Sequence, residues 1–178
     1  MYEKNVVIIL STAGAAYLVF LAVQSWINTG RDPITAAELA LRGITNNNPM
    51  NLKYEASNNW VGQTGSDGTF CVFDTAEHGI RAGMILILGK VANGINTLAA
   101  LGDIWAPPAS AGGDNNSVVG QYGAGLASYL SVDPNTEYDL GGNIVEVAKA
   151  IVHNEEGIQP YSDATYQQAA LDAASEQA

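Results

Sequence analysis

Residues 6–23 read VVIILSTAGAAYLVFLAV and carry no charged side chain. A helix needs about 20 mainly apolar residues to cross the hydrocarbon core of a bilayer, and a buried core helix seldom continues this long without a polar face. Trp26 follows the run at the level where an indole favours the headgroup interface. We therefore expect residues 1–27 to be a retained transmembrane anchor, residues 28–33 a linker and residues 34–178 one soluble domain. Lys4 and Arg31 lie on opposite sides of the run, so the flanking charges encode the orientation only weakly.

The charge of the chain limits its partners. Eighteen acidic residues against seven Lys and Arg give a net charge of −11. Such a surface repels nucleic acid and anionic lipid headgroups, so we expect no nucleic-acid partner and a domain that faces away from any enclosed genome. Cys71 is the one cysteine, which excludes an internal disulfide, and its neighbours Phe70, Val72 and Phe73 indicate a core position.

The pattern after the linker is mainly helical. Asp32-Pro33 predicts a helix start, with a helix over residues 34–42 that ends at Gly43. Residues 46–51, NNNPMN, predict a loop, and residues 52–73 an irregular β-hairpin. Further helices are expected from Ala76, after an Asn96 cap, around residues 122–130, from Ile144 to Gly157, and over residues 164–174. The fold class is α+β, a mainly helical domain with a small β-hairpin.

The sequence contains no phosphate loop, dinucleotide fingerprint, metal-binding helix or nucleophile elbow. His78 precedes the Gly-Ile-Arg start of a helix and is read as a capping or surface residue. His153 follows Val152 and is read as a surface residue rather than a general base. We therefore expect no metal site and no cofactor.

Two glutamates lie on the apolar stripes of predicted helices. Glu155 follows Ile151 by four residues, and Glu38 lies between Ile34 and Leu41. Apolar surroundings disfavour the ionised carboxyl and raise its pKa toward the range of a general acid for glycosidic cleavage. The alternative is that each glutamate reaches water or a lysine, which for Glu155 is Lys149.

Side chains suited to holding sugar accompany these glutamates. Aromatic faces stack on pyranose rings, and amides match hydroxyl and acetamido groups, although each such residue on its own is more typical of a core or a turn. The candidate substrate-binding residues are Asn48, Asn51, Tyr54, Trp60, Gln63, Trp105, Tyr122 and Tyr161.

The segments RGITNNNPMNLKY, SDGTFCVFDTAEHGIRA, INTLAALGDIWAPP, YGAGLASYLSVDP and AIVHNEEGIQPYSD occur in the order and spacing of a family of phage and prophage proteins. The similarity spans about residues 42–163. Members of this family resemble lysozyme-like enzymes that cleave peptidoglycan, the lytic transglycosylases and glucosaminidases. Some carry the name of a membrane-associated structural protein of PM2, a tailless, membrane-containing marine phage of the corticovirus group.

The chain departs from the family pattern at several positions. Met50 replaces a glycine, Thr45 replaces an arginine, and the family's His-Glu-Asn-Gly reads Asn154, Glu155, Glu156 and Gly157. A looser run also follows Trp-Ala-Pro-Pro, where such sites contribute substrate contacts. Glu155 matches the motif's glutamate, whereas Glu38 lies outside the matched region.

The resemblance implies two functions. The first is a virion membrane protein whose lysozyme-like domain cuts host cell-wall glycan at entry. The second is a non-catalytic scaffold that links the viral inner membrane to the capsid shell. Both imply a single-pass protein of the virion inner membrane, present in the host membrane during assembly, with the lipid bilayer and capsid proteins as partners and host peptidoglycan as a further partner of the enzyme.

Overall fold

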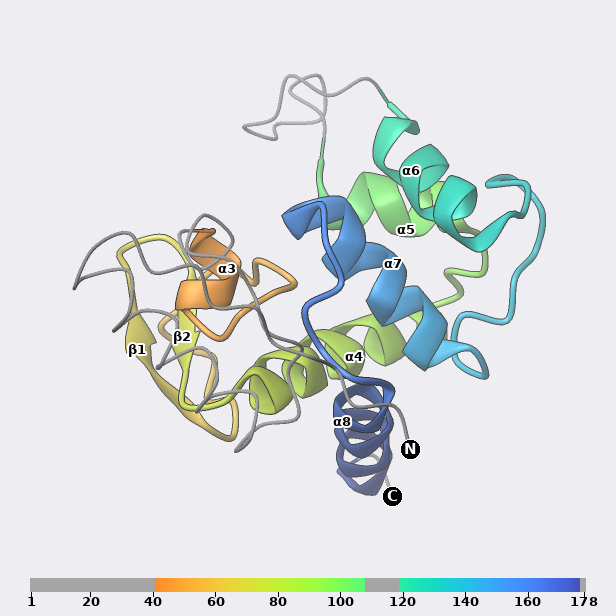
Figure 1. The fold of residues 1–178 in the computed structure, drawn as a ribbon. Coiled ribbons are helices and arrows are strands. Elements are labelled where there is room, and N and C mark those ends of the chain that lie inside the picture. The colour runs from red at the N-terminus through yellow and green to blue at the C-terminus, as the bar shows by residue number, and fades with distance from the viewer. Residues whose placement is uncertain (1–40, 108–118, 177–178) are drawn as a thin grey trace, which may run out of the picture.

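The computed structural model of the chain describes residues 41–107 and 119–176. This part is mainly helical and holds one two-stranded antiparallel sheet, an α+β arrangement, as the sequence predicts. The elements are α3 (Arg42–Thr45), β1 (Gln63–Ser66), β2 (Cys71–Phe73), α4 (Ala76–Ala92), α5 (Leu98–Trp105), α6 (Gln121–Leu130), α7 (Ile144–Glu156) and α8 (Asp163–Ser175) (Figure 1).

Within the two described ranges, no helix combines the length and the apolar character that a bilayer span requires. The uncharged run at residues 6–23 and the linker at residues 28–33 lie outside these ranges. The membrane anchor therefore stays a prediction.

The hairpin forms where the sequence predicts it. β1 and β2 pair antiparallel with Gln63 opposite Phe73 and Ser66 opposite Cys71, and the register shifts between Gln63 and Gly65. The side chain of Cys71 is fully buried, which confirms its core position. The hairpin packs against α4 through β2, so it forms one side of the domain rather than an isolated ribbon.

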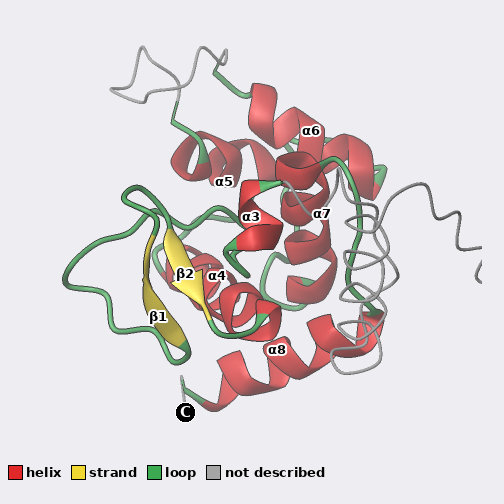
Figure 2. Cartoon of the chain, turned by 60° about the vertical axis from the view of Figure 1, so that its left-hand side comes forward, coloured by secondary structure: helices red, strands yellow, loops and turns green. Residues whose placement is uncertain are grey.

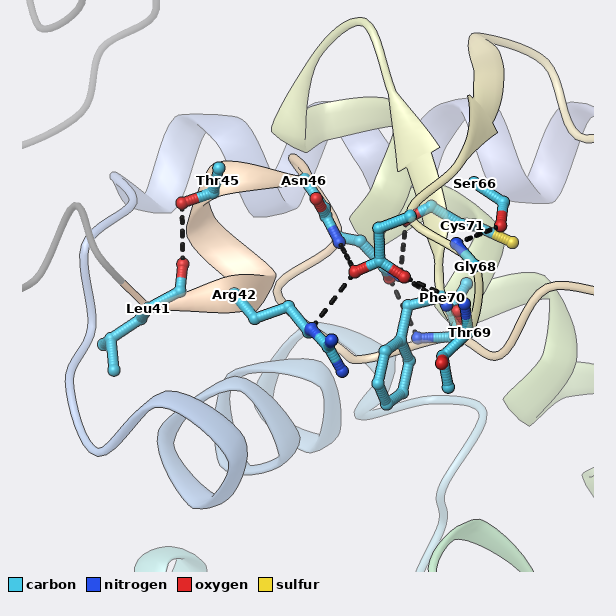
Figure 3. Close-up of polar contacts among 12 residues, drawn as sticks. Leu41, Arg42, Thr45, Asn46, Ser66, Gly68, Thr69, Phe70 and Cys71 are labelled. Atoms are coloured by element: carbon cyan, nitrogen blue, oxygen red, sulfur yellow. Dashed lines mark hydrogen bonds and ion pairs between the residues drawn. The ribbon is translucent and has the colours of Figure 1, made fainter.

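A carboxylate ties α3 to the turn of the hairpin (Figure 3). Asp67 accepts hydrogen bonds from the backbone N–H groups of Phe70 (2.8 Å) and Thr69 (3.0 Å) and from the amide of Asn46 (2.7 Å), and it pairs with Arg42 at 3.1 Å. The Phe70 N–H, followed by these other donors, lowers the pKa of Asp67 to about 2. The turn and α3 are thus held together by an ionised side chain.

The prediction that Gly43 ends a helix is wrong. Leu41 is extended, with φ −64° and ψ 131°, and α3 starts at Arg42 and continues through Gly43. The glycine serves a close approach instead, because a Cβ there would lie 1.8 Å from Oε1 of Glu156 on α7. The rest of the predicted helix, residues 34–40, lies outside the described part.

α4 is the central helix, and it starts at Ala76 as the sequence predicts. Ile80, Met84 and Ile87 are fully buried, and the Thr75 hydroxyl caps the helix by accepting a hydrogen bond from the His78 N–H. α8 packs along α4, α7 also contacts it, and the sheet covers its N-terminal part (Figure 2). α4 therefore connects the hairpin side of the domain to the helical side.

α5 and α6 cross with their backbones in contact. A Cβ on Gly102 would lie 2.3 Å from the backbone nitrogen of Gly123, so only glycine fits at this crossing. The predicted Asn96 cap is off by one residue. Thr97 caps α5 by accepting from the Ala100 N–H, while the Asn96 amide donates to Glu137 at 2.9 Å.

The last two helices follow the sequence closely. α7 ends at Gly157, whose φ of +71° is the left-handed conformation that favours glycine. Ser162 caps the start of α8, because its hydroxyl accepts a hydrogen bond from the Thr165 N–H. The C-terminal end of α7 lies between α3 and the hairpin on one side and α5 and α6 on the other (Figure 1).

Candidate active site

Glu155 lies in the last turn of α7, at the point where the two sides of the domain meet. Its Oε2 accepts a hydrogen bond of 2.8 Å from the amide of Asn51, and its Oε1 accepts one of 2.5 Å from the hydroxyl of Tyr122. The side chain is half-buried. Three segments far apart in the sequence therefore converge on one carboxylate, and all three residues are among those that the sequence singled out.

The loop after α3 places Asn51 for this contact. Its φ of +51° is left-handed, a conformation that asparagine tolerates better than most residues. Asn48 holds the loop from inside, because its amide donates to the carbonyls of Leu52 and Cys71 and its oxygen accepts from the Leu52 N–H. Asn48 is fully buried, so the structure places this predicted substrate ligand in the core of the loop.

Tyr122 is held as a hydrogen-bond donor. Burial, together with the neighbouring carboxylate of Glu155, raises the pKa of the Tyr122 phenol far above its usual value. The phenol therefore keeps its proton at any physiological pH and donates a hydrogen bond to Glu155. Tyr122 comes from the first turn of α6, so the position of α6 sets one side of the site.

Glu156 was not selected from the sequence. Its side chain is buried, and its Oε1 has no hydrogen-bond partner among the described residues. Burial and then the charge of Glu155 raise the pKa of Glu156 from its ordinary 4.5 to about 7. The signal that could have found it is Val152, which is fully buried and lies four residues earlier on the same helical face.

The apolar surroundings expected around Glu155 occur one residue later, at the buried Glu156. The alternative that Glu155 pairs with Lys149 is wrong. Lys149 pairs instead with Glu146 at 3.0 Å and Asp163 at 2.9 Å.

A pocket of about 310 Å³ lies on the Asn51 side of the site. Asn51 belongs to both features, since it donates to Glu155 and also lines the pocket. Trp105, the last residue of α5, lies in the pocket wall. The full lining is Asn51, Leu52, Lys53, Leu86, Lys90, Ile104, Trp105 and Pro107.

The remaining candidate ligands lie elsewhere. Tyr54 is 41% exposed and hydrogen-bonds through its backbone N–H to Thr69 at the hairpin. Trp60 and Gln63 are half-buried on the hairpin side and joined by a backbone hydrogen bond of 3.1 Å. Tyr161 is buried, edge-to-face with Tyr166, at a centroid distance of 6.2 Å. Glu38 lies outside the described residues.

The two histidines lie away from Glu155. His78 contacts Asp74 at 2.6 Å in the first turn of α4, and His153 is exposed and packs on the ring of Tyr129 at 5.0 Å. Across residues 41–107 and 119–176, no group of three or more His, Cys, Asp and Glu residues is arranged to hold a metal ion. Around Glu155 the described residues offer a carboxylate, a phenol and an amide.

No family model matches the chain. Over 93 residues it is 37% identical to protein P5 of Pseudoalteromonas phage PM2. The chain is similar to a phage protein. The similarity covers 49% of this chain and 58% of P5, so the chain matches somewhat more than half the length of that relative.

Proposed function

We propose that the chain is a virion membrane protein whose soluble domain binds and cleaves the β-1,4 glycan of host peptidoglycan during entry. The observation that carries the proposal is Glu155, a half-buried carboxylate fixed by Asn51 and Tyr122 from two separate segments. Pre-positioning of this kind is what acid–base chemistry on a glycosidic bond requires. The similarity to P5 of phage PM2 supports the phage setting.

In the proposed reaction, Glu155 protonates the oxygen of the glycosidic bond as the bond to the sugar breaks. The resulting carboxylate then takes a proton from water, or from a hydroxyl of the same sugar, as that oxygen bonds to the anomeric carbon. Asn51 and Tyr122 orient the carboxyl throughout.

The neighbouring Glu156 retains a proton up to about neutral pH. Its burial, and then the charge of Glu155, raise the pKa of Glu156 to about 7.

The second candidate is a scaffold that links the viral inner membrane to capsid proteins. Two observations favour it. Both oxygens of Glu155 already accept hydrogen bonds from the protein, and the net charge of −11 opposes approach to an anionic cell wall. Both candidates use the predicted anchor at residues 6–23 and the same location, the virion inner membrane with the domain facing away from the genome.

The deciding experiment measures release of soluble fragments from purified peptidoglycan by the full chain in detergent. We expect turnover by the wild type and a loss of at least about 100-fold in Glu155→Gln, which keeps the shape of the side chain but cannot transfer its proton. Glu146→Gln is the matched control, because Glu146 is exposed and pairs only with Lys149 among the contacts described above. Equal rates for the wild type and Glu155→Gln, or no release at any pH between 4 and 8, would leave the scaffold as the function.

A further inference from the structure

The pocket beside Glu155 concentrates positive charge in a negatively charged molecule. The described part of the chain contains five Lys and Arg residues, and two of them, Lys53 and Lys90, line this one pocket. The chain as a whole has a net charge of −11. A pair of ammonium groups in this setting provides local attraction for an anion that the rest of the surface repels.

The two lysines come from different parts of the fold. Lys53 precedes the hairpin and bridges to Phe70, whereas Lys90 lies in the last turn of α4. Both residues are exposed to solvent. The two elements are fixed relative to each other, because β2 packs on α4.

The wall between the lysines is apolar. Leu52, Leu86, Ile104, Trp105 and Pro107 contribute it. A volume of about 310 Å³ is at the lower end of the range of small-molecule sites, about 300 to 1,000 Å³. The chemistry that fits is a short aliphatic segment that ends in a carboxylate.

Asn51 connects the pocket to Glu155. Its amide donates to Glu155, and Asn51 is also one of the residues that line the pocket. A sugar bound at Glu155 would therefore have the pocket on its Asn51 side. On a cell-wall glycan, the substituent with small aliphatic side chains and free carboxylates is the short acidic peptide carried on alternate sugars.

We propose that Lys53 and Lys90 bind the carboxylates of this peptide, so that the site selects peptide-bearing strands over bare glycan. This specificity rests on the proposed glycan-cleaving function. It also accounts for how a domain of net charge −11 engages an anionic polymer, since the attraction is confined to the pocket that receives the charged group.

The test measures binding by calorimetry, with the full chain in detergent. The probe is N-acetylmuramyl-L-alanyl-D-isoglutamine, which has a peptide carboxylate but no β-1,4 bond, so its binding is independent of cleavage. The comparison ligands are its γ-amide and the tetramer of N-acetylglucosamine. We expect the carboxylate probe to bind about tenfold or more tightly than the amide, and its affinity to fall by a similar factor in the double variant Lys53→Gln, Lys90→Gln.

The matched control is Lys4→Gln, Arg31→Gln, which makes the same change in net charge and alters none of the described residues that line the pocket. The variant Lys53→Arg, Lys90→Arg keeps the charge and is expected to retain binding. Equal affinity for probe and amide, or equal losses in the pocket and control variants, overturns the proposal even if Glu155 cleaves glycan. If binding depends on the two lysines but no glycan is cleaved, the peptide-binding proposal stands and the proposed glycan-cleaving function is wrong.

Discussion

Two neighbouring glutamates at the end of α7 have different surroundings. Glu155 points toward donors from Asn51 and Tyr122, whereas Glu156 is buried against Gly43 with Oε1 unpartnered among the described residues. Adjacent helical residues face directions about 100° apart, so one carboxyl meets polar groups and the other meets packed backbone. At the residue scale, burial rather than sequence position raises the pKa of Glu156.

Glu156 makes stability depend on pH. Its folded-state pKa, about 7, is above its ordinary value of 4.5, so the folded state binds a proton more tightly than the unfolded state does. Below about pH 4.5 Glu156 is protonated in both states and does not change the free energy of unfolding. As pH rises toward 7, ionisation in the unfolded state lowers this free energy progressively, by at most about 3 kcal/mol. We expect Glu156→Gln to remove this loss and to be the more stable protein at pH 7.5, as measured by urea unfolding at pH 4.5 and 7.5.

Glu146→Gln is again the matched control, because Glu146 is half exposed and belongs to the same helix. Its stability is expected to follow the pH dependence of the wild type. If Glu156→Gln showed the same pH dependence as the wild type, the Glu156 carboxyl would have to be ionised in the folded protein.

At the element scale, glycines decide how closely helices approach. Gly102 and Gly123 bring α5 and α6 into backbone contact, and this contact fixes the helix that carries Trp105 against the helix that carries Tyr122. A methyl group at the crossing has no space, because the atoms it would meet belong to the backbone. The distance between these helices is therefore set by the absence of two side chains.

Gly102→Ala is expected to destabilise the fold by about 1–3 kcal/mol, because the helices must separate to admit the methyl group. Chemical denaturation against Gly89→Ala provides the comparison. Gly89 also lies within a helix, α4, but a Cβ there meets nothing within 4 Å, so alanine is expected to stabilise by up to about 1 kcal/mol. Equal effects at the two positions would contradict the close crossing.

The helices and the hairpin could be predicted because their signals are local. The apolar residues Ile80 and Met84 indicate the helix in which they lie, and Gly157 indicates the end of the helix that precedes it. The sequence misassigned Gly43, since a glycine that ends a helix and one that admits another helix look alike along the chain. Asn51 and Glu155 could be selected by type, but their contact spans 104 positions and depends on the packing of α7.

At the scale of the whole molecule, the domain carries its acidic charge beside a predicted bilayer anchor. A negative surface is repelled by anionic headgroups, so attachment to lipid would depend on the uncharged run rather than on electrostatic attraction.

We expect the full chain to float with vesicles of zwitterionic and of anionic lipid alike, at low and at high salt. A chain that starts at residue 28 is expected to stay in the soluble fraction in every case. Flotation of the shorter chain with anionic vesicles, or loss of flotation of the full chain in high salt, would contradict anchoring by residues 6–23. Density-gradient fractions probed with an antibody to the soluble domain provide the readout.

The Asp67 network determines where a mechanical load would enter this domain. Any pull on the chain ahead of Leu41 reaches α3 first, and α3 is clamped to the hairpin turn through Arg42 and Asn46. Gly43, in the same short helix, packs against Glu156. We expect the clamp to take up such a load before it reaches the glutamate pair, because the contacts of Asp67 would have to break first.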